Sequence, residues 1–155
     1  MSARLVLMSE EEMATFRDAQ LEPYIADRIG AGESAEVARA TAEEQMAGLF
    51  PGGRPTPGHL IFHVVDDEGD VCGSLWIGPR DLAQPELMWI WDIEIDEQHR
   101  GRGLGRQAMD LAEEEARRRG ASEIGLNVFG QNHVARGLYG SLGYIESSIL
   151  MRKTL

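Results

Sequence analysis

The sequence predicts an α/β fold in which a mixed central sheet is flanked by helices. Short apolar runs, rich in β-branched and aromatic residues, alternate with longer segments whose apolar residues recur at helical spacing. In the first half, an acidic turn that contains a glycine joins two such runs, which indicates an antiparallel hairpin. In the second half, a strand, a glycine-rich turn, a helix and another strand follow one another. This unit should be parallel and right-handed.

The N-terminal part is expected to contain one strand and two helices. Residues 4–8 read as the strand, and Ser9 and Glu12 form a capping box at the start of the first helix. Pro23 should kink or break this helix, which glycines then end. A second helix is expected over residues 34–50, since a proline follows it directly.

Strands and helices alternate in the rest of the chain. Strands are expected at 59–65, 71–77 and 87–95, a helix at 104–119, a strand at 122–129, a helix at 132–142 and a last strand at 144–151. The whole order is therefore β-α-α-β-β-β-α-β-α-β. With 155 residues and ordinary globular composition, we expect one domain over residues 1–155.

Composition and charge narrow the class of protein. The single cysteine, Cys72, excludes an internal disulfide framework and suits a reducing compartment. No segment reads as a signal peptide or reaches membrane-spanning length, so we expect a cytoplasmic protein without a membrane partner. The net charge of −11 argues against nucleic acid as a partner. An acidic protein can attract cationic small molecules or basic peptide termini, although the charge also serves simply to keep a protein soluble.

A glycine- and arginine-rich turn lies between the strand at 87–95 and the helix that follows. Its glycines let the backbone approach a bulky anion, because no Cβ stands in the way. The first amides of the helix lack intrahelical partners and carry the positive end of the helix dipole. The turn is therefore expected to hold phosphate, through Arg100, Gly101, Arg102, Gly103, Leu104, Gly105 and Arg106.

A dinucleotide-binding site is one interpretation of this turn, because Gly103, Gly105 and Ala108 match the spacing of that fingerprint. In that motif the glycines follow the strand directly, and an acidic residue stands about 20 positions later. Here residues 96–99 separate the strand from the glycines, and no acidic residue stands at the required place. The sequence therefore disfavours a Rossmann fold.

Two blocks of sequence resemble the GNAT superfamily of acyl-CoA-dependent N-acyltransferases. The turn at 100–105 fits that family's Arg/Gln-x-x-Gly-x-Gly/Ala motif. Residues 127–144, in which an Asn opens a short helix and Leu-Tyr precedes Leu-Gly-Tyr, resemble its downstream pattern. The resemblance covers residues 87–153 well and the first half only in general layout. It implies a GNAT-like sheet with the element order given above.

The resemblance also implies how acetyl-CoA would be held as co-substrate, with no metal. Backbone amides of the turn would hold the pyrophosphate, and the strand at 87–95 would pair with pantetheine. The Asn that opens the short helix would contact the CoA arm and is also sufficient as a helix N-cap. The expected cofactor-binding residues are Ile93, Ile95, Arg100, Gly101, Arg102, Gly103, Leu104, Gly105, Arg106 and Asn132.

The expected catalytic residues are Tyr139, Glu94 and Asp92. Tyr139 matches the family's general acid. Many relatives have a Glu general base at the position of Asn127, and Asn cannot take that proton. Period-2 alternation places Asp92 and Glu94 on one face of their strand, opposite Trp91, Ile93 and Ile95. The base is then Glu94, Asp92 or an ordered water, although a structural role for both carboxylates is equally open.

The four histidines are not expected to bind metal or act in catalysis. His59 and His63 lie on one strand, where residues four apart are separated by about 13 Å, too far to share an ion. His99 and His133 lie beside the cofactor motifs and suit the surface or the neighbourhood of phosphate.

These observations predict an N-acetyltransferase that moves the acetyl group of acetyl-CoA to a primary amine by direct attack. The acceptor would be a small-molecule amine or a peptide amino group. The alternative is a non-catalytic, regulatory acyl-CoA-binding module, because Asn127 stands where relatives often have a base. The sequence leaves a homodimer open.

Overall fold

The computed structural model describes residues 2–155. Its elements, in chain order, are β1 (Arg4–Leu7), α1 (Glu10–Gly30), α2 (Ala35–Leu49), the short 3-10 turn η1 (Pro51–Gly53), β2 (Leu60–Val65), β3 (Val71–Pro79), β4 (Leu87–Ile95), the 3-10 turn η2 (Glu97–His99), α3 (Leu104–Arg118), β5 (Glu123–Leu126) and α4 (His133–Ser141). The α/β class is confirmed, and most elements lie within two residues of their expected positions.

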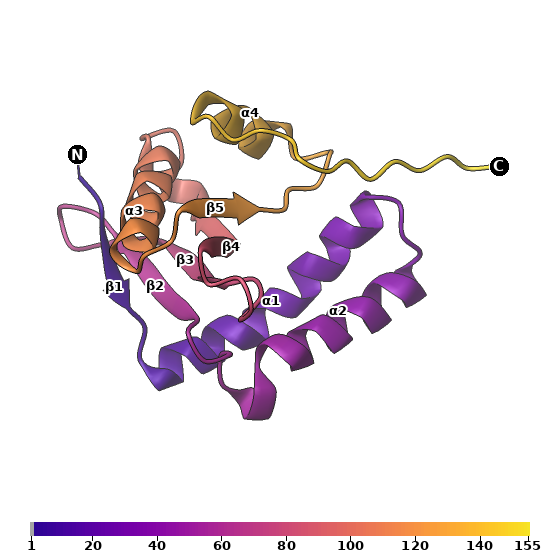
Figure 1. Cartoon of the computed structure of the whole chain (residues 1–155), viewed down its shortest axis with the longest axis horizontal. Coiled ribbons are helices and arrows are strands. Elements are labelled where there is room, and N and C mark those ends of the chain that lie inside the picture. Colours follow the sequence, from indigo (N-terminus) through magenta and orange to yellow (C-terminus); the bar gives the residue numbers. More distant parts are fainter. Residues whose placement is uncertain (1) are drawn as a thin grey trace.

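The strands form one mixed sheet in the order β1-β2-β3-β4-β5. The pairs from β1 to β4 are antiparallel, and β4 pairs with β5 in parallel. Helix α3 connects this parallel pair, as the sequence predicts. Helices α1 and α2 lie side by side on one side of the sheet in Figure 1, and α3 lies on the other.

Two apolar clusters fill the two faces of the sheet. Helix α3 buries Leu104 and Met109 with sheet residues such as Leu75 in the larger cluster. On the opposite face, Phe16 of α1 packs with Trp76 and other apolar residues. The sheet therefore carries side chains on both faces that are withdrawn from water, which is the main source of its stability.

Helix α1 begins with the predicted capping box. The Ser9 hydroxyl accepts a hydrogen bond from the amide of Glu12, and the Glu12 carboxylate accepts one from the amide of Ser9. Of the kink or break expected at Pro23, the break is not formed, because α1 continues through Pro23 to Gly30. Leu21, Tyr24 and Ile25, on either side of Pro23, pack against α2, and this contact offsets the cost of the missing backbone hydrogen bond.

The last predicted strand, at 144–151, is not formed. After α4 the chain has no assigned helix or strand through residue 155, and Figure 1 shows it running away from the body. Arg136 holds Glu146 at 3.0 Å, and Arg152 lies 3.6 Å from the Glu33 carboxylate at the junction of α1 and α2. Residues 144–151 therefore have the sequence of a strand, but they pair with none of the strands of the described sheet.

Within residues 2–155, no helix is both long enough and apolar enough to cross a membrane.

Candidate active site

The glycine-rich turn has the backbone geometry that the sequence predicts. Gly101 and Gly103 have φ values of 77° and 78°, in the left-handed region that favours glycine. A Cβ added at either position would meet nothing within 4 Å, so the turn borders open space. Gly103 is the N-cap of α3, and no side chain among residues 2–155 caps this helix. The first amides of α3 are therefore available to an anion.

The three arginines of the turn point to different partners. The exposed Arg100 donates from Nε to the carbonyl of Ile95 at 2.8 Å. The exposed Arg106 donates to the Ser141 hydroxyl at 2.7 Å, which joins α3 to α4. The Arg102 guanidinium instead lies 3.6 Å from the buried Asp66 carboxylate in the turn between β2 and β3. Arg102 thus fixes the glycine-rich turn to the sheet, a contact that its spacing does not show.

Strand β4 has an unpaired edge beside this turn. Its parallel pairing with β5 starts at Leu87 and ends at Ile90, while its pairing with β3 continues to Ile95. Residues 91–95 therefore have a neighbouring strand on the β3 side only, among the described residues. Backbone donors and acceptors on such an edge can pair with an extended ligand. This edge contains Ile93 and Ile95, the predicted partners of pantetheine.

A β-bulge in β4 corrects the predicted alternation. Trp76 of β3 pairs with Asp92, and the next residue, Ile77, pairs with Ile90, so Trp91 is the extra residue. Trp91 stacks on Trp76 at a ring-centroid distance of 5.9 Å, on the α1 side. The expectation that Trp91 shares a face with Ile93 and Ile95 is therefore wrong. Those two isoleucines pack on the α3 side.

Asp92 lies on the α1 side of the sheet, because it stands directly opposite Trp76 and such pairs share a face. Its Oδ2 is buried, and no donor among the described residues hydrogen-bonds to it. Burial, then the negative charges of Glu94 and Asp27, raise its pKa to about 7. A carboxyl group with this pKa can exchange a proton near neutral pH.

Glu94 has a different environment, although it lies on the same face. Its side chain is 59% exposed, and its carboxylate lies 4.0 Å from the Arg100 guanidinium. Solvent screens a pair of this kind strongly. Of the two predicted carboxylates, Asp92 is therefore the one in an unusual environment.

Tyr139 extends from α4 toward the same region. It is half-buried against the larger apolar cluster, and its ring centroid lies 6.0 Å from that of Tyr144. Burial and then the charge of Asp92 raise the pKa of its hydroxyl. Tyr139 thus stays protonated at neutral pH. The charge of Asp92 acts on its hydroxyl, although the Tyr139 ring packs with the α3-side cluster and Asp92 lies on the α1 side of the sheet.

The two asparagines of the second motif have distinct positions. Asn132 is the N-cap of α4, as predicted, and its side chain accepts a hydrogen bond from the amide of Ala135 at 3.2 Å. Asn127 is exposed and follows the end of β5, because that strand stops at Leu126 and not at residue 129 as expected. The early end of β5 leaves residues 91–95 of β4 without a paired strand on that side, among the described residues.

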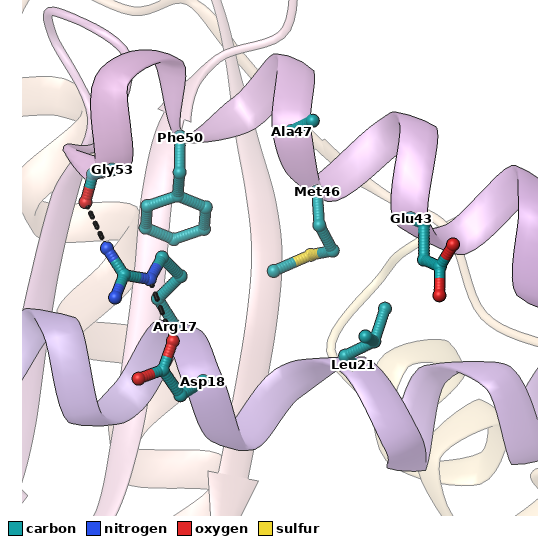
Figure 2. Close-up of a pocket in the computed structure, with 8 residues that line it drawn as sticks. All are labelled: Arg17, Asp18, Leu21, Glu43, Met46, Ala47, Phe50 and Gly53. Carbon is teal, nitrogen blue, oxygen red and sulfur yellow. Dashed lines mark hydrogen bonds and ion pairs between the residues drawn. The ribbon is translucent and has the colours of Figure 1, made fainter.

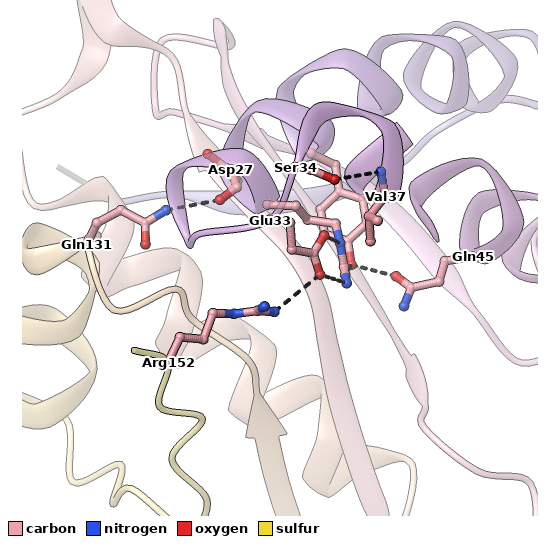
Figure 3. A network of polar contacts seen from close by, with 9 residues as sticks. Asp27, Glu33, Ser34, Val37, Gln45, Gln131 and Arg152 are labelled. Atoms are coloured by element: carbon pink, nitrogen blue, oxygen red, sulfur yellow. Dashed lines mark hydrogen bonds and ion pairs between the residues drawn. The ribbon is translucent and has the colours of Figure 1, made fainter. Parts of the chain in front are cut away.

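Asp27 of α1 is a site residue that the sequence reasoning missed. It acts on Asp92 through its charge, and its backbone carbonyl accepts a hydrogen bond from Gln131, which links α1 to the start of α4 (Figure 3). A polar residue at one position of an amphipathic helix gives no signal of this kind in a single sequence.

His59 and His63 have the structural surroundings expected of strand histidines. The His59 Nδ1 accepts a hydrogen bond from the Trp76 indole at 3.1 Å, and its Nε2 donates to the Pro79 carbonyl at 3.3 Å. Burial lowers the pKa of His59, which favours this neutral form. His63 instead faces the Glu12 carboxylate at 2.6 Å. The two rings thus have separate partners, as their strand spacing predicts.

A groove lies between α1 and α2, apart from the residues above. Its volume is about 350 Å³, and Figure 2 shows Arg17 crossing one end to reach the carbonyl of Gly53 and the Asp18 carboxylate. None of the predicted site residues lines it. The groove is therefore separate from the edge of β4 at residues 91–95.

The fold belongs to the α/β class that the sequence predicts, and comparison with known proteins identifies the family. A model of the acetyltransferase (GNAT) family matches residues 14–144. The chain therefore belongs to the GNAT family, and it is a transferase that acts on acyl groups.

Individual relatives agree with this class. The uncharacterized N-acetyltransferase YdgE of Bacillus subtilis is 32% identical over 96% of this chain and 95% of its own length. The crystal structure of YycN, also from Bacillus subtilis, superposes with a TM-score of 0.88 at 30% identity and covers 99% of each chain. AAC(6')-Iy, at 18% identity and a TM-score of 0.61, shares the fold alone.

Proposed function

We propose that this chain transfers the acetyl group of acetyl-CoA to a primary amine by direct attack. The reaction would take place along the edge of β4 at residues 91–95. The proposal rests on the edge of β4 at residues 91–95, which lacks a paired strand on one side. The glycine-rich turn follows the end of this edge. Asp92 belongs to the same stretch of β4, and its charge acts on Tyr139 of α4. The shared fold of AAC(6')-Iy, which was crystallised with a bisubstrate analogue that contains CoA, supports the choice of co-substrate.

The residues of the turn fit the phosphates of CoA. The amides of residues 101–106 would hold the pyrophosphate at the start of α3, and the exposed Arg100 and Arg106 would add positive charge. The edge at Ile93 and Ile95 would pair with pantetheine. This binding would position the thioester carbon next to the amine, and positioning supplies much of the catalysis.

Asp92 is the proposed general base and Tyr139 the proposed general acid. A lysine-like amine has a reference pKa near 10, so it arrives protonated and must lose a proton before it attacks. Asp92, with a pKa of about 7, would take that proton directly or through a water. A backbone amide near Ile93 would stabilise the oxyanion, and Tyr139 would protonate the leaving thiolate.

The acceptor is proposed to be a cationic amine, either a small molecule or a peptide amino group. Asp92 and Glu94 share one face of β4, and the charge of Asp27 of α1 acts on Asp92. Three carboxylates in one region favour a positively charged ligand. The test is a thiol-release assay with acetyl-CoA over polyamines, aminoglycosides, amino acids and peptides, with calorimetry of CoA binding to Gly103→Glu and Arg100→Ala.

The outcomes separate the two candidate functions. Release of CoA thiol with some amine, together with weaker CoA binding by the two variants, is the expected result. Binding of CoA without turnover on any amine would favour the regulatory module, which Asn127 suggests. Unchanged CoA affinity in both variants would remove the pyrophosphate from the turn at 101–106.

A further inference from the structure

Asp66 is a buried carboxylate that the proposed reaction does not use directly. It is 1% exposed and follows β2 as the first residue of the turn to β3. Its Oδ1 accepts hydrogen bonds from the amides of Glu68 and Asp70, at 3.0 and 2.9 Å. These two bonds hold the carboxylate in one orientation. The other oxygen, Oδ2, can then act on a partner outside the turn.

The partner of Oδ2 is Arg102 of the glycine-rich turn. Its Nη2 lies 3.6 Å from Oδ2 of Asp66, and its side chain is only 32% exposed. His99, which precedes the same turn, also acts on Asp66 through its charge. Hydrogen bonds from the backbone of Asp70 and Glu68, and then these two charges, outweigh burial and lower the pKa of the Asp66 carboxyl. Asp66 is therefore ionised at neutral pH.

The glycine-rich turn needs such a contact, because its glycines do not select one conformation. Gly101 and Gly103, on either side of Arg102, have φ values of 77° and 78°. Glycine reaches other conformations at similar energy, so the backbone alone does not hold the form that binds an anion. The pair with Asp66 restrains the residue that lies between the two glycines.

The balance of charge disfavours Arg102 as a direct phosphate ligand. Its positive charge is offset by Asp66, whereas Arg100 and Arg106 are exposed and can face an anion. Without Arg102, the buried negative charge of Asp66 would be uncompensated near the phosphates and would repel them. The two side chains therefore work as one unit.

We infer that Asp66 is a positioning residue for CoA: through Arg102 it holds the glycine-rich turn in the form that binds the pyrophosphate, and Arg102 does not itself bind phosphate. This rests on the proposed function, since CoA is taken as the ligand of the turn. If Arg102 were instead a direct ligand that Asp66 draws away, loss of the Asp66 charge would release Arg102 toward the phosphates. CoA would then bind as tightly as before or more tightly.

The inference is tested with substitutions on both sides of the pair. Asp66→Asn keeps an oxygen that can accept both amide hydrogen bonds and removes the charge. Asp66→Ser is a second variant, because a serine hydroxyl can also accept within a turn of this kind. Arg102→Gln removes the partner. Asp67→Asn is the matched control, since Asp67 is the next residue of the same turn, is exposed and loses the same charge.

Calorimetry of CoA binding to the folded full chain gives the first readout. Both Asp66 variants and Arg102→Gln should bind CoA about 10–100-fold more weakly, as removal of an orienting partner does at metal sites. Asp67→Asn should bind as wild type does. The double variant Asp66→Asn/Arg102→Gln should bind no more weakly than the weaker single variant, because both substitutions remove one contact.

The amide resonances of Gly101 and Gly103 in the free protein give the second readout, which a loss of stability alone would not move. They should shift in Asp66→Asn and in Arg102→Gln and stay in place in Asp67→Asn.

Three results would overturn the inference alone, provided that wild type binds CoA. The first is unchanged or tighter CoA binding by the Asp66 variants, which would make Arg102 a direct ligand or a bystander. The second is a double variant whose loss is the product of the two single losses. The third is weaker binding without a shift of the glycine resonances. Absence of CoA binding by wild type would instead overturn the proposed function, and this inference with it.

Discussion

Replacement of Asp92 by Asn should change the pH dependence of stability in a way that follows from its burial. In the folded protein its pKa is about 7, against an ordinary value of 3.8. The difference is about three units, which corresponds to about 4 kcal/mol at 1.36 kcal/mol per unit. Between pH 4 and 7 the folded protein holds a proton that the unfolded chain has released, so stability falls as pH rises. Above pH 7 this loss is complete.

Asn cannot ionise, so Asp92→Asn should not show this fall. Its buried amide carries a cost of its own, about 1–3 kcal/mol if unpaired, but that cost is the same at every pH. The free energy of unfolding of the variant relative to wild type should therefore rise by up to about 4 kcal/mol from pH 4 to pH 8.5. Urea unfolding at several pH values measures this difference directly.

Asp18→Asn is the matched control for this experiment. The Asp18 side chain is 72% exposed, so its removal should leave the pH profile parallel to that of wild type. If the profile of Asp92→Asn is also parallel to wild type, the Asp92 carboxyl ionises as it does in water. It could not then have the raised pKa on which its proposed role as base depends.

Three further predictions concern the site itself. Gly103→Ala forces a side chain onto a φ of 78°, so α3 should start with about 1–2 kcal/mol of strain, and CoA affinity measured by calorimetry should fall. Tyr139→Phe should lower kcat by about 10²–10⁴ with little change in the KM for acetyl-CoA, as expected for removal of one acid, and a fully active variant would exclude Tyr139 as the acid. Glu94→Gln removes a charge that raises the pKa of Asp92, so the acid limb of the pH–rate profile should move to lower pH. A profile that loses its acid limb altogether would identify Glu94 as the base in place of Asp92.

The sequence predicted the parts of the fold that depend on local pattern. The start of α3 at Leu104 and the capping box at Ser9 follow from glycine, serine and glutamate at fixed spacing, and both are in the structure. The sequence could not decide between a kink and a break at Pro23, because a local rule about proline does not include the contact between α1 and α2. The segment at 144–151 was misleading for a related reason, since strand propensity does not supply a strand to pair with.

The site was predicted less completely, because its distinguishing features depend on pairing between distant strands. Alternation placed Asp92 and Glu94 together on one face, which is correct. It could not show that a bulge moves Trp91 to that same face, since the bulge depends on the register with β3. It also could not rank the two carboxylates, because the burial of Asp92 and its coupling to Asp27 exist only after α1 has packed on the sheet.

The end of β5 at Leu126 explains why the edge of β4 near Asp92 is unpaired, and the proposed function depends on that edge. Had β5 continued in register beyond Leu126, it would have paired with β4 up to Ile95 and covered the edge that the proposed pantetheine uses. Because it stops, residues 91–95 of β4 have no paired strand on that side among the described residues, and the bulge at Trp91 lies where this unpaired stretch begins. Asp92 is the next residue, and no donor among residues 2–155 hydrogen-bonds to its buried Oδ2. A buried acceptor without a donor is unfavourable in the free protein. An ammonium group that reaches this carboxyl would supply that donor, which is the physical argument for the proposal that the second substrate is a cationic amine.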